Sequence, residues 1–119
     1  MTGVQTCALP IWHLSGKYVD DPHAVGRVTL FKGYAQRYTK PNVAAASAAY
    51  AQLARANNLA PTQLALSFVM QRWCVASTII GATSMAQIQD NIAAYQVKLS
   101  PETLKEIDAI HLRFTNPAP

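Results

Sequence analysis

The segment CVASTIIG, residues 74–81, is the feature that most restricts how this chain can fold. It has no charged residue, is apolar at nearly every position, is rich in β-branched side chains and ends at Gly81. This composition is typical of a parallel strand that is buried on both faces of a sheet. A strand alone leaves the hydrogen-bonding groups on both of its edges unpaired. The sequence therefore predicts an α/β fold whose other strands lie outside this segment.

Two helices are predicted before that strand. The segment PNVAAASAAYAQLARANN, residues 41–58, has a capping residue at Asn42 and a left-handed stop at Asn57–Asn58. Its apolar stripe consists of Val43, Ala46, Tyr50, Leu53 and Ala54. The next helix begins near Pro61 and continues through TQLALSFVMQR. One face of that helix carries Leu64, Ala65, Phe68 and Val69.

Two further helices are predicted after the strand. The first begins at once, because Ser84 and Gln87 stand at capping-box spacing. Its apolar stripe consists of Met85, Ile88, Ile92 and Tyr95. The last helix starts at Ser100 and buries Leu104, Ile107 and Ile110. We expect Trp73 and Cys74 to be packing residues, and residues 13–40 to be irregular because glycines and a proline interrupt them.

Composition limits the kinds of partner. The net charge is +4, and the region from Pro22 to Gln89 contains six cations and no acidic residue, which favours an anionic ligand. The cations are not interleaved with aromatic residues, so we expect no nucleic-acid partner. No apolar run reaches the ~18 residues that a membrane helix needs, so no membrane partner is expected. No His and Cys stand at metal-ligand spacing, and Cys74 has no partner for a disulfide once Cys7 is set aside, which indicates the cytoplasm.

Residues 1–12 have no place in the predicted fold. MTGVQTCALPI has no helix or strand period and no cationic region that would make it a signal peptide. Its letters match the translation of a sequencing adapter. We therefore expect residues 1–12 to be an adapter-derived scar, and residues 13–119 to be the C-terminal third of a longer protein that contains the missing strands.

The turn GATS, Gly81 to Ser84, is the candidate site for an anion. It joins the predicted strand to a helix N-terminus, where unpaired N–H groups and the positive end of the helix dipole favour negative charge. In (β/α)8 barrels, phosphate sites often lie beside such a helix start. Alternatively, Ser84 is only the cap of the helix. The four residues alone leave both readings open.

Three stretches resemble the aldo-keto reductases. These are LSGKY at Leu14–Tyr18, then Arg27, and IIGATSMAQIQDNI at Ile79–Ile92. The bacterial NADP(H)-dependent, Tas-like branch is the most similar, and that branch also resembles the potassium-channel β subunits. The resemblance covers the chain from Leu14 onward, including the terminal PAP. It implies a (β/α)8 TIM barrel of which this chain is the C-terminal part, mostly helical with one strand.

The resemblance also implies a cofactor site for NADP(H). Lys17 matches the lysine near the pyrophosphate, and Arg27 matches the arginine beside the adenosine 2′-phosphate. The residues that match those around the same phosphate and the adenine are Gly81, Thr83, Gln87, Asp90 and Asn91. Aspartate stands at position 90 where glutamate is usual, which shortens its reach. Each residue has an ordinary alternative: Gln87 completes the capping box, Lys17 and Arg27 are solvated loop charges, and Asn91 faces water.

The family reduces carbonyls by hydride transfer from NADPH, with a tyrosine as general acid. The resemblance therefore implies an oxidoreductase whose substrate is a small carbonyl or alcohol. No tyrosine of this chain matches the catalytic position, so we predict no catalytic residue here and an inactive fragment. One alternative is a non-catalytic NADP(H)-sensing regulator of the channel-β type. A small, weakly basic nucleic-acid binder is a third reading. Substrate identity and oligomeric state are not encoded in the stretches that match.

Overall fold

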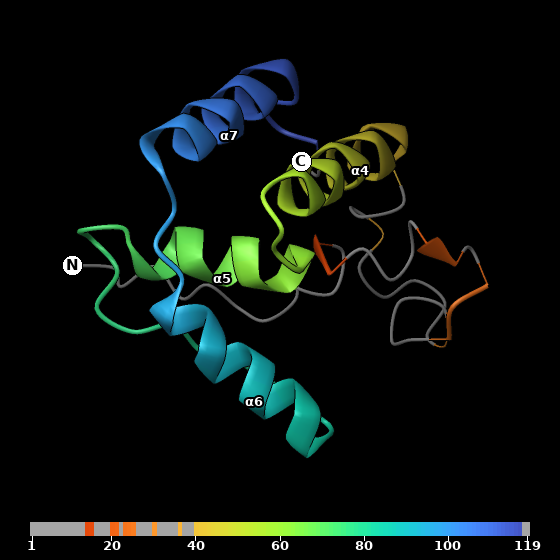
Figure 1. Cartoon of the computed structure of the whole chain (residues 1–119). Coiled ribbons are helices and arrows are strands. Elements are labelled where there is room, and N and C mark those ends of the chain that lie inside the picture. Colours follow the sequence, from red (N-terminus) through yellow and green to blue (C-terminus); the bar gives the residue numbers. More distant parts are fainter. Residues whose placement is uncertain are drawn as a thin grey trace.

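A computed structural model describes residues 14–15, 20–21, 23–25, 30, 36 and 40–117. From residue 40 onward it consists of α4 (Pro41–Ala56), α5 (Pro61–Met70), α6 (Met85–Ala93), the 3₁₀ helix η2 (Ala94–Gln96) and α7 (Pro101–Arg113). Figure 1 shows α5 in the middle, with α4 and α7 on one side and α6 on the other. None of the helices in these ranges is long and apolar enough to cross a membrane.

The ends of α4 follow from its proline and its asparagines. The helix starts at Pro41 with Lys40 at the N-cap position, and no side chain caps it. The prediction that Asn42 is the cap is wrong, because proline is pre-organised for the first helical position and places Asn42 inside the first turn. Asn58 has φ of 56°, which confirms the left-handed stop. Asparagine adopts this conformation more readily than other residues with a side chain.

The core lies between α4, α5 and α7. Leu53, Ala54, Leu64 and Ile107 are buried against one another, and Tyr50, Phe68, Leu104 and Ile110 are partly buried beside them, which confirms these members of the predicted stripes. The predicted face of α5 is wrong in part, because Leu66 and Ser67 are the most buried residues of that helix. A polar link joins α4 to α7 beside this core. The Thr103 hydroxyl donates to Oδ1 of Asn57 at 2.8 Å, and Nδ2 of Asn57 donates to the Leu53 carbonyl at 2.9 Å. The side chain that ends α4 therefore also fixes the start of α7.

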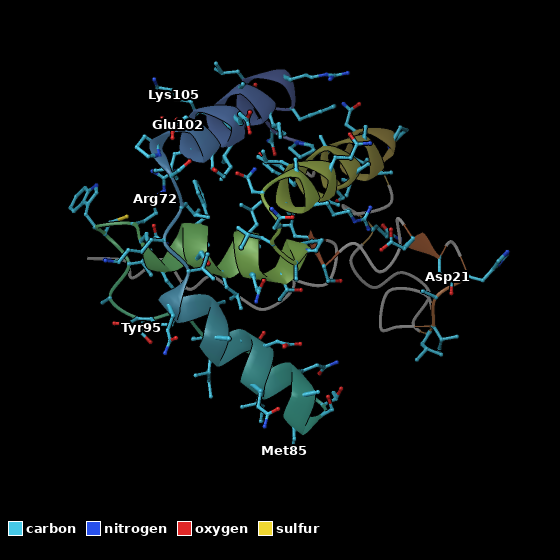
Figure 2. The ribbon with its side chains drawn as sticks, viewed as in Figure 1. Asp21, Arg72, Met85, Tyr95, Glu102 and Lys105 are labelled. Atoms are coloured by element: carbon cyan, nitrogen blue, oxygen red, sulfur yellow. The ribbon has the colours of Figure 1, made fainter. Side chains whose placement is uncertain are left out.

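The connection after α6 is attached to α5 by hydrogen bonds. The Ser67 hydroxyl donates to the Ala94 carbonyl at 2.9 Å, and both residues have an exposed fraction of 0%. Nε2 of Gln71 donates to the Val97 carbonyl at 2.7 Å. The apolar stripe of α6 remains uncovered: the exposed fractions are 70% for Met85, 37% for Ile88, 60% for Ile92 and 77% for Tyr95. In Figure 2, Met85 and Tyr95 point away from the other helices.

The strand predicted at residues 74–81 does not form, and no strand occurs among the described residues. Residues 75–84 contain neither helix nor strand, and Ile79 and Ile80 are 54% and 37% exposed. A strand requires a neighbouring strand to pair with, and the described part of the chain offers none. The packing predicted for Trp73 and Cys74 is also wrong, because Trp73 is 96% exposed and Cys74 is exposed.

The unpaired segment should make the chain aggregate. Val75–Ile80 is an uncharged, β-rich window without proline, and such windows associate when their backbone is unpaired. Ile80→Lys should slow aggregation in light-scattering and thioflavin assays. Leu112→Lys, at an exposed position on α7, is the matched control and should have little effect. A wild-type chain that stays monomeric and unfolds cooperatively would contradict this prediction.

Candidate functional site

The turn Gly81–Ser84 leads directly into the N-terminus of α6. Ser84 is the N-cap residue, and its hydroxyl accepts a hydrogen bond from the Gln87 N–H at 3.3 Å. The Ser84 carbonyl accepts from the Ile88 N–H at 3.2 Å and begins the helical pattern. The predicted cap is therefore confirmed. Residues 81–90 are all exposed, so the turn is open to a ligand from solution.

Gln87 reaches one residue further back than a capping box requires. Its Oε1 accepts from the Thr83 N–H at 2.7 Å and from the Thr83 hydroxyl at 3.1 Å. In a capping box it would accept from the N–H of Ser84. The prediction of Gln87 as part of such a box is therefore correct for the Ser84 half and wrong for the glutamine half. Thr83 and Gln87 hold each other across the turn.

Asn91 fixes the other end of the turn. It is 6% exposed, although it lies on a helix whose neighbouring side chains are in solvent. Its Nδ2 lies 3.5 Å from the Gly81 carbonyl, at the long limit of a hydrogen bond. The alternative that Asn91 faces water is wrong. Asp90 is exposed beside it. Its carbonyl accepts from the Ala94 N–H, whereas its carboxylate has no hydrogen bond within the described residues. Gly81, Thr83, Gln87 and Asn91 are thus brought together by the fold.

The first turn of α6 is electrostatically suited to an anion. It contains no acidic residue, and Asp90 lies in the second turn. In the described part of the chain, the N–H groups of Met85 and Ala86 have no hydrogen-bond partner, as expected at a helix start. Those groups and the helix dipole attract negative charge. The described residues also contain no cluster of three or more His, Cys, Asp or Glu side chains that could hold a metal ion.

The other two predicted site residues, Lys17 and Arg27, lie outside the described residues. The nearest described residues in the chain are Ser15 and Asp20 around Lys17, and Val25 and Leu30 around Arg27. Asp20 and Ala24 lie between them in the chain, and Asp20 forms an ion pair with Arg55 on α4. No sequence pattern pointed to this pair, because the two residues are 35 positions apart and belong to different segments.

A cavity that the sequence did not predict lies between α4, α5 and α7. Its volume is about 470 Å³, within the range of ligand pockets. The lining comprises Leu14, Tyr50, Pro61, Leu64, Ala65, Phe68, Val69, Arg72, Ile107, Asp108 and His111. At its rim the Arg72 guanidinium stacks on the Phe68 ring, 3.9 Å from the ring centroid. None of the residues at the start of α6 lines this cavity.

Tyr50 is the tyrosine of this cavity, and its acidity does not suit proton donation. Burial, and secondarily the Asp108 carboxylate, raise the pKa of Tyr50 above the ordinary value of 10.0. An efficient general acid needs a pKa near the working pH, which for a tyrosine means a lower value. The structure therefore gives no reason to assign a catalytic role to Tyr50.

In a comparison with known protein families, residues 13–112 match the Aldo/keto reductase family. The chain is 43% identical over 107 residues to "Protein tas" of Escherichia coli (strain K12), which covers 89% of this chain and 31% of that protein. It is 33% identical over 111 residues to an "Aldo-keto reductase" of Babesia bovis, covering 87% of this chain and 38% of the other. The chain is 46% identical over 57 residues to "Putative voltage-gated potassium channel subunit beta" of Schizosaccharomyces pombe (strain 972 / ATCC 24843). That match covers 46% of this chain and 16% of the other.

The raised pKa of Tyr50 predicts a loss of stability at high pH. The pKa of Tyr50 is higher in the folded state than in the unfolded state, so the unfolded state loses this proton first as the pH rises. The stabilisation is therefore complete below pH 10 and decreases as the pH rises from 10 through the folded pKa. Urea unfolding at rising pH, measured with Ile80→Lys present in every chain to slow aggregation, should show this loss, and Tyr50→Phe should reduce it. Tyr95→Phe, at an exposed site, is the control. Equal pH dependence in wild type and Tyr50→Phe would contradict the assignment.

Proposed function

The chain belongs to the aldo/keto reductase family, and from this premise we propose that it forms the NADP(H)-binding, C-terminal part of a family oxidoreductase. The family fold is a (β/α)8 barrel. The chain spans 31% of the length of the Escherichia coli relative, so the activity of a whole barrel is part of the proposal. We propose that residues 13–119 form this part and that residues 1–12 do not contribute to it.

The observation that carries the proposal is the exposed turn at the start of α6. Gly81, Thr83 and Gln87, which match the residues around the 2′-phosphate in the family, lie together beside the unpaired N–H groups of Met85 and Ala86. An anion at this place meets the positive end of a helix and no acidic side chain in the first turn. This is the charge pattern that a phosphate requires. It supports the adenosine 2′-phosphate as the group bound there.

Binding would exchange one hydrogen bond for a stronger one. The Thr83 hydroxyl now donates to Oε1 of Gln87 at 3.1 Å. A phosphate oxygen is charged and is a better acceptor than an amide oxygen, so we expect Thr83 to turn its hydroxyl to the phosphate. Gln87 then presents an amide N–H to the same group after rotation of its side chain. The buried Asn91 keeps Gly81 in place during this change.

The remaining contacts are assigned from the family. Arg27 would hold the 2′-phosphate with its planar fork of donors, and Lys17 would lie near the pyrophosphate. Asp90 and Asn91 would lie near the adenine. Asp90 is the more accessible of the two, because Asn91 is buried and its amide faces the Gly81 carbonyl. When bound, NADPH supplies the hydride for a carbonyl substrate. The residues of this chain bind and orient the cofactor and take no part in proton transfer.

Arg27→Ala should weaken NADPH binding and leave NADH binding nearly unchanged, since NADH lacks the 2′-phosphate. Hydrogen bonds to charged groups contribute roughly 1.5–3 kcal/mol, which corresponds to about 10- to 150-fold in Kd. The Kd of each cofactor is measured by fluorescence titration of a whole barrel that contains residues 13–119. Lys105→Ala, which removes an exposed cation on α7, is the control. Equal weakening for both cofactors would place Arg27 at the pyrophosphate or in a structural role.

The 119-residue chain by itself should not reduce carbonyls. A positioned general acid contributes about 10²–10⁴-fold to such reactions, and this chain has no tyrosine at the matching position. NADPH oxidation in the presence of a reactive aldehyde is followed by its near-ultraviolet absorbance, with a protein-free reaction as the blank. A rate above the blank would contradict the prediction. NADPH binding without turnover in a whole barrel would instead favour the regulatory alternative.

A further inference from the structure

The cavity between α4, α5 and α7 has a continuous apolar wall. On α5 this wall consists of Leu64, Ala65, Phe68 and Val69, and Ile107 adds to it from α7. The four residues of α5 share one face of the helix, because they are spaced three and four positions apart. With a volume of about 470 Å³ the cavity can hold a small molecule. The body of such a molecule has to be apolar to match this wall.

The cavity is elongated and has a cation at one end. Pro61, the first residue of α5, and Arg72, two residues beyond the last one, both line it. The cavity therefore follows the whole helix, whose ten residues span roughly 15 Å at 1.5 Å per residue. Figure 2 shows Arg72 at the end of α5, on the side toward α7. A ligand longer than a single aromatic ring fits this shape.

The guanidinium of Arg72 is oriented but unpaired. It lies over the Phe68 ring, 3.9 Å from the ring centroid. Among the described residues it has no ion pair and no hydrogen bond. The ring contacts the face of the guanidinium, so the N–H donors at the edge of its plane stay available. These donors match the two oxygens of a carboxylate, which makes this end of the cavity suitable for an anionic group.

The acidic residue of the lining does not neutralise this cation. Asp108 lines the cavity from α7. Burial and the Asp108 carboxylate both raise the pKa of Tyr50, so this carboxylate lies near Tyr50 on α4. It forms no ion pair with Arg72 in the described structure. His111, one helical turn further along α7, is the remaining titratable group of the lining.

We propose that this cavity is a binding site for an elongated, apolar monocarboxylate, whose body packs on the α5 wall and whose carboxylate pairs with Arg72. A carboxylate is favoured over an ammonium group, because Arg72 attracts the first and repels the second at this end. The inference is independent of the proposed function, since no residue at the start of α6 lines the cavity.

Three probes with the same two rings test the choice of end group. These are biphenyl-4-carboxylate, the neutral biphenyl-4-carboxamide and the cationic 4-biphenylmethylammonium. Their Kd values are measured by equilibrium dialysis against the full chain, with Ile80→Lys present in every sample to slow aggregation. Ile80 does not line the cavity. We expect the carboxylate to bind most tightly and the ammonium most weakly, and salt should reduce this difference. Equal affinity for all three probes would contradict the role of Arg72.

Arg72→Ala tests the proposed ion pair. It should weaken binding of the carboxylate by about 2- to 12-fold, the contribution of an ordinary hydrogen bond, and leave the carboxamide nearly unchanged. Arg72 is exposed, so water competes for its donors and a larger effect is not expected. Arg113 provides the matched control, because its guanidinium lies 5.1 Å from the centroid of the Phe114 ring and does not line the cavity. Equal weakening in Arg113→Ala would reduce the effect to long-range charge and overturn the assignment.

Ala65→Phe and Val69→Phe test the location of the body, since each fills part of the cavity. Both should weaken binding of the carboxylate and the carboxamide alike. The exposed apolar residues of α6 are unchanged in these variants, so undiminished binding would place the probe there and overturn the inference. Helical circular dichroism identifies a variant that has lost its fold. The other variant then decides, or Arg72→Ala if both have lost it.

Two further results would also overturn the inference. If no probe binds the wild-type cavity, it is not a site for small carboxylates. If gel filtration shows a dimer that Ala65→Phe dissociates, a second copy of the chain covers the cavity instead. The start of α6 is a separate site, so failure of NADPH binding would leave the result with these probes unchanged, and failure of the probes would leave the proposed function unchanged.

Discussion

The hydrogen bond from the Ser67 hydroxyl to the Ala94 carbonyl determines where the candidate site lies. Both residues are completely buried, so neither group has water as an alternative partner. An unpaired buried polar group costs roughly 1–3 kcal/mol, which makes this contact costly to break. The apolar stripe of α6 contributes little to its own placement, because that stripe is exposed. The position of α6, and of the turn that precedes it, therefore depends largely on the attachment of η2 to α5.

The site itself is maintained by its own polar side chains. Gln87 accepts two hydrogen bonds from Thr83, and Asn91 lies against the Gly81 carbonyl from one helical turn further on. The turn is thus organised without a ligand, and a bound phosphate would not have to order it from a disordered state. A preorganised site loses less conformational entropy on binding. Ser84 is the helix cap that the sequence offered as the alternative to an anion site, and Thr83 is held separately by Gln87.

Local patterns in the sequence predicted the helices and the core, because these depend on residues three or four positions apart. The left-handed Asn58 and the buried Ile107 are examples. The prediction of a strand at residues 74–81 was wrong, because a strand depends on partners outside its own segment. Periodicity could not reveal the Asp20–Arg55 pair or the cavity beside Phe68, since both join distant segments. Within the site, the cap at Ser84 was predictable from spacing. The hydrogen bond from the Thr83 N–H to Gln87, in place of one from the Ser84 N–H, was not, because it depends on the rotation of the Gln87 side chain.

The exposure of Trp73 has a spectroscopic consequence. At 96% exposed, its indole is surrounded by water and sits two residues before the apolar segment Val75–Ile80. The chain has one other tryptophan, Trp12, so a Trp12→Phe variant would leave Trp73 as the sole fluorophore of that kind. Indole emission moves to shorter wavelength when water is removed from around the ring. A blue shift in that variant would then show directly when the neighbouring apolar residues become covered, whether by the rest of a barrel or by another copy of the chain.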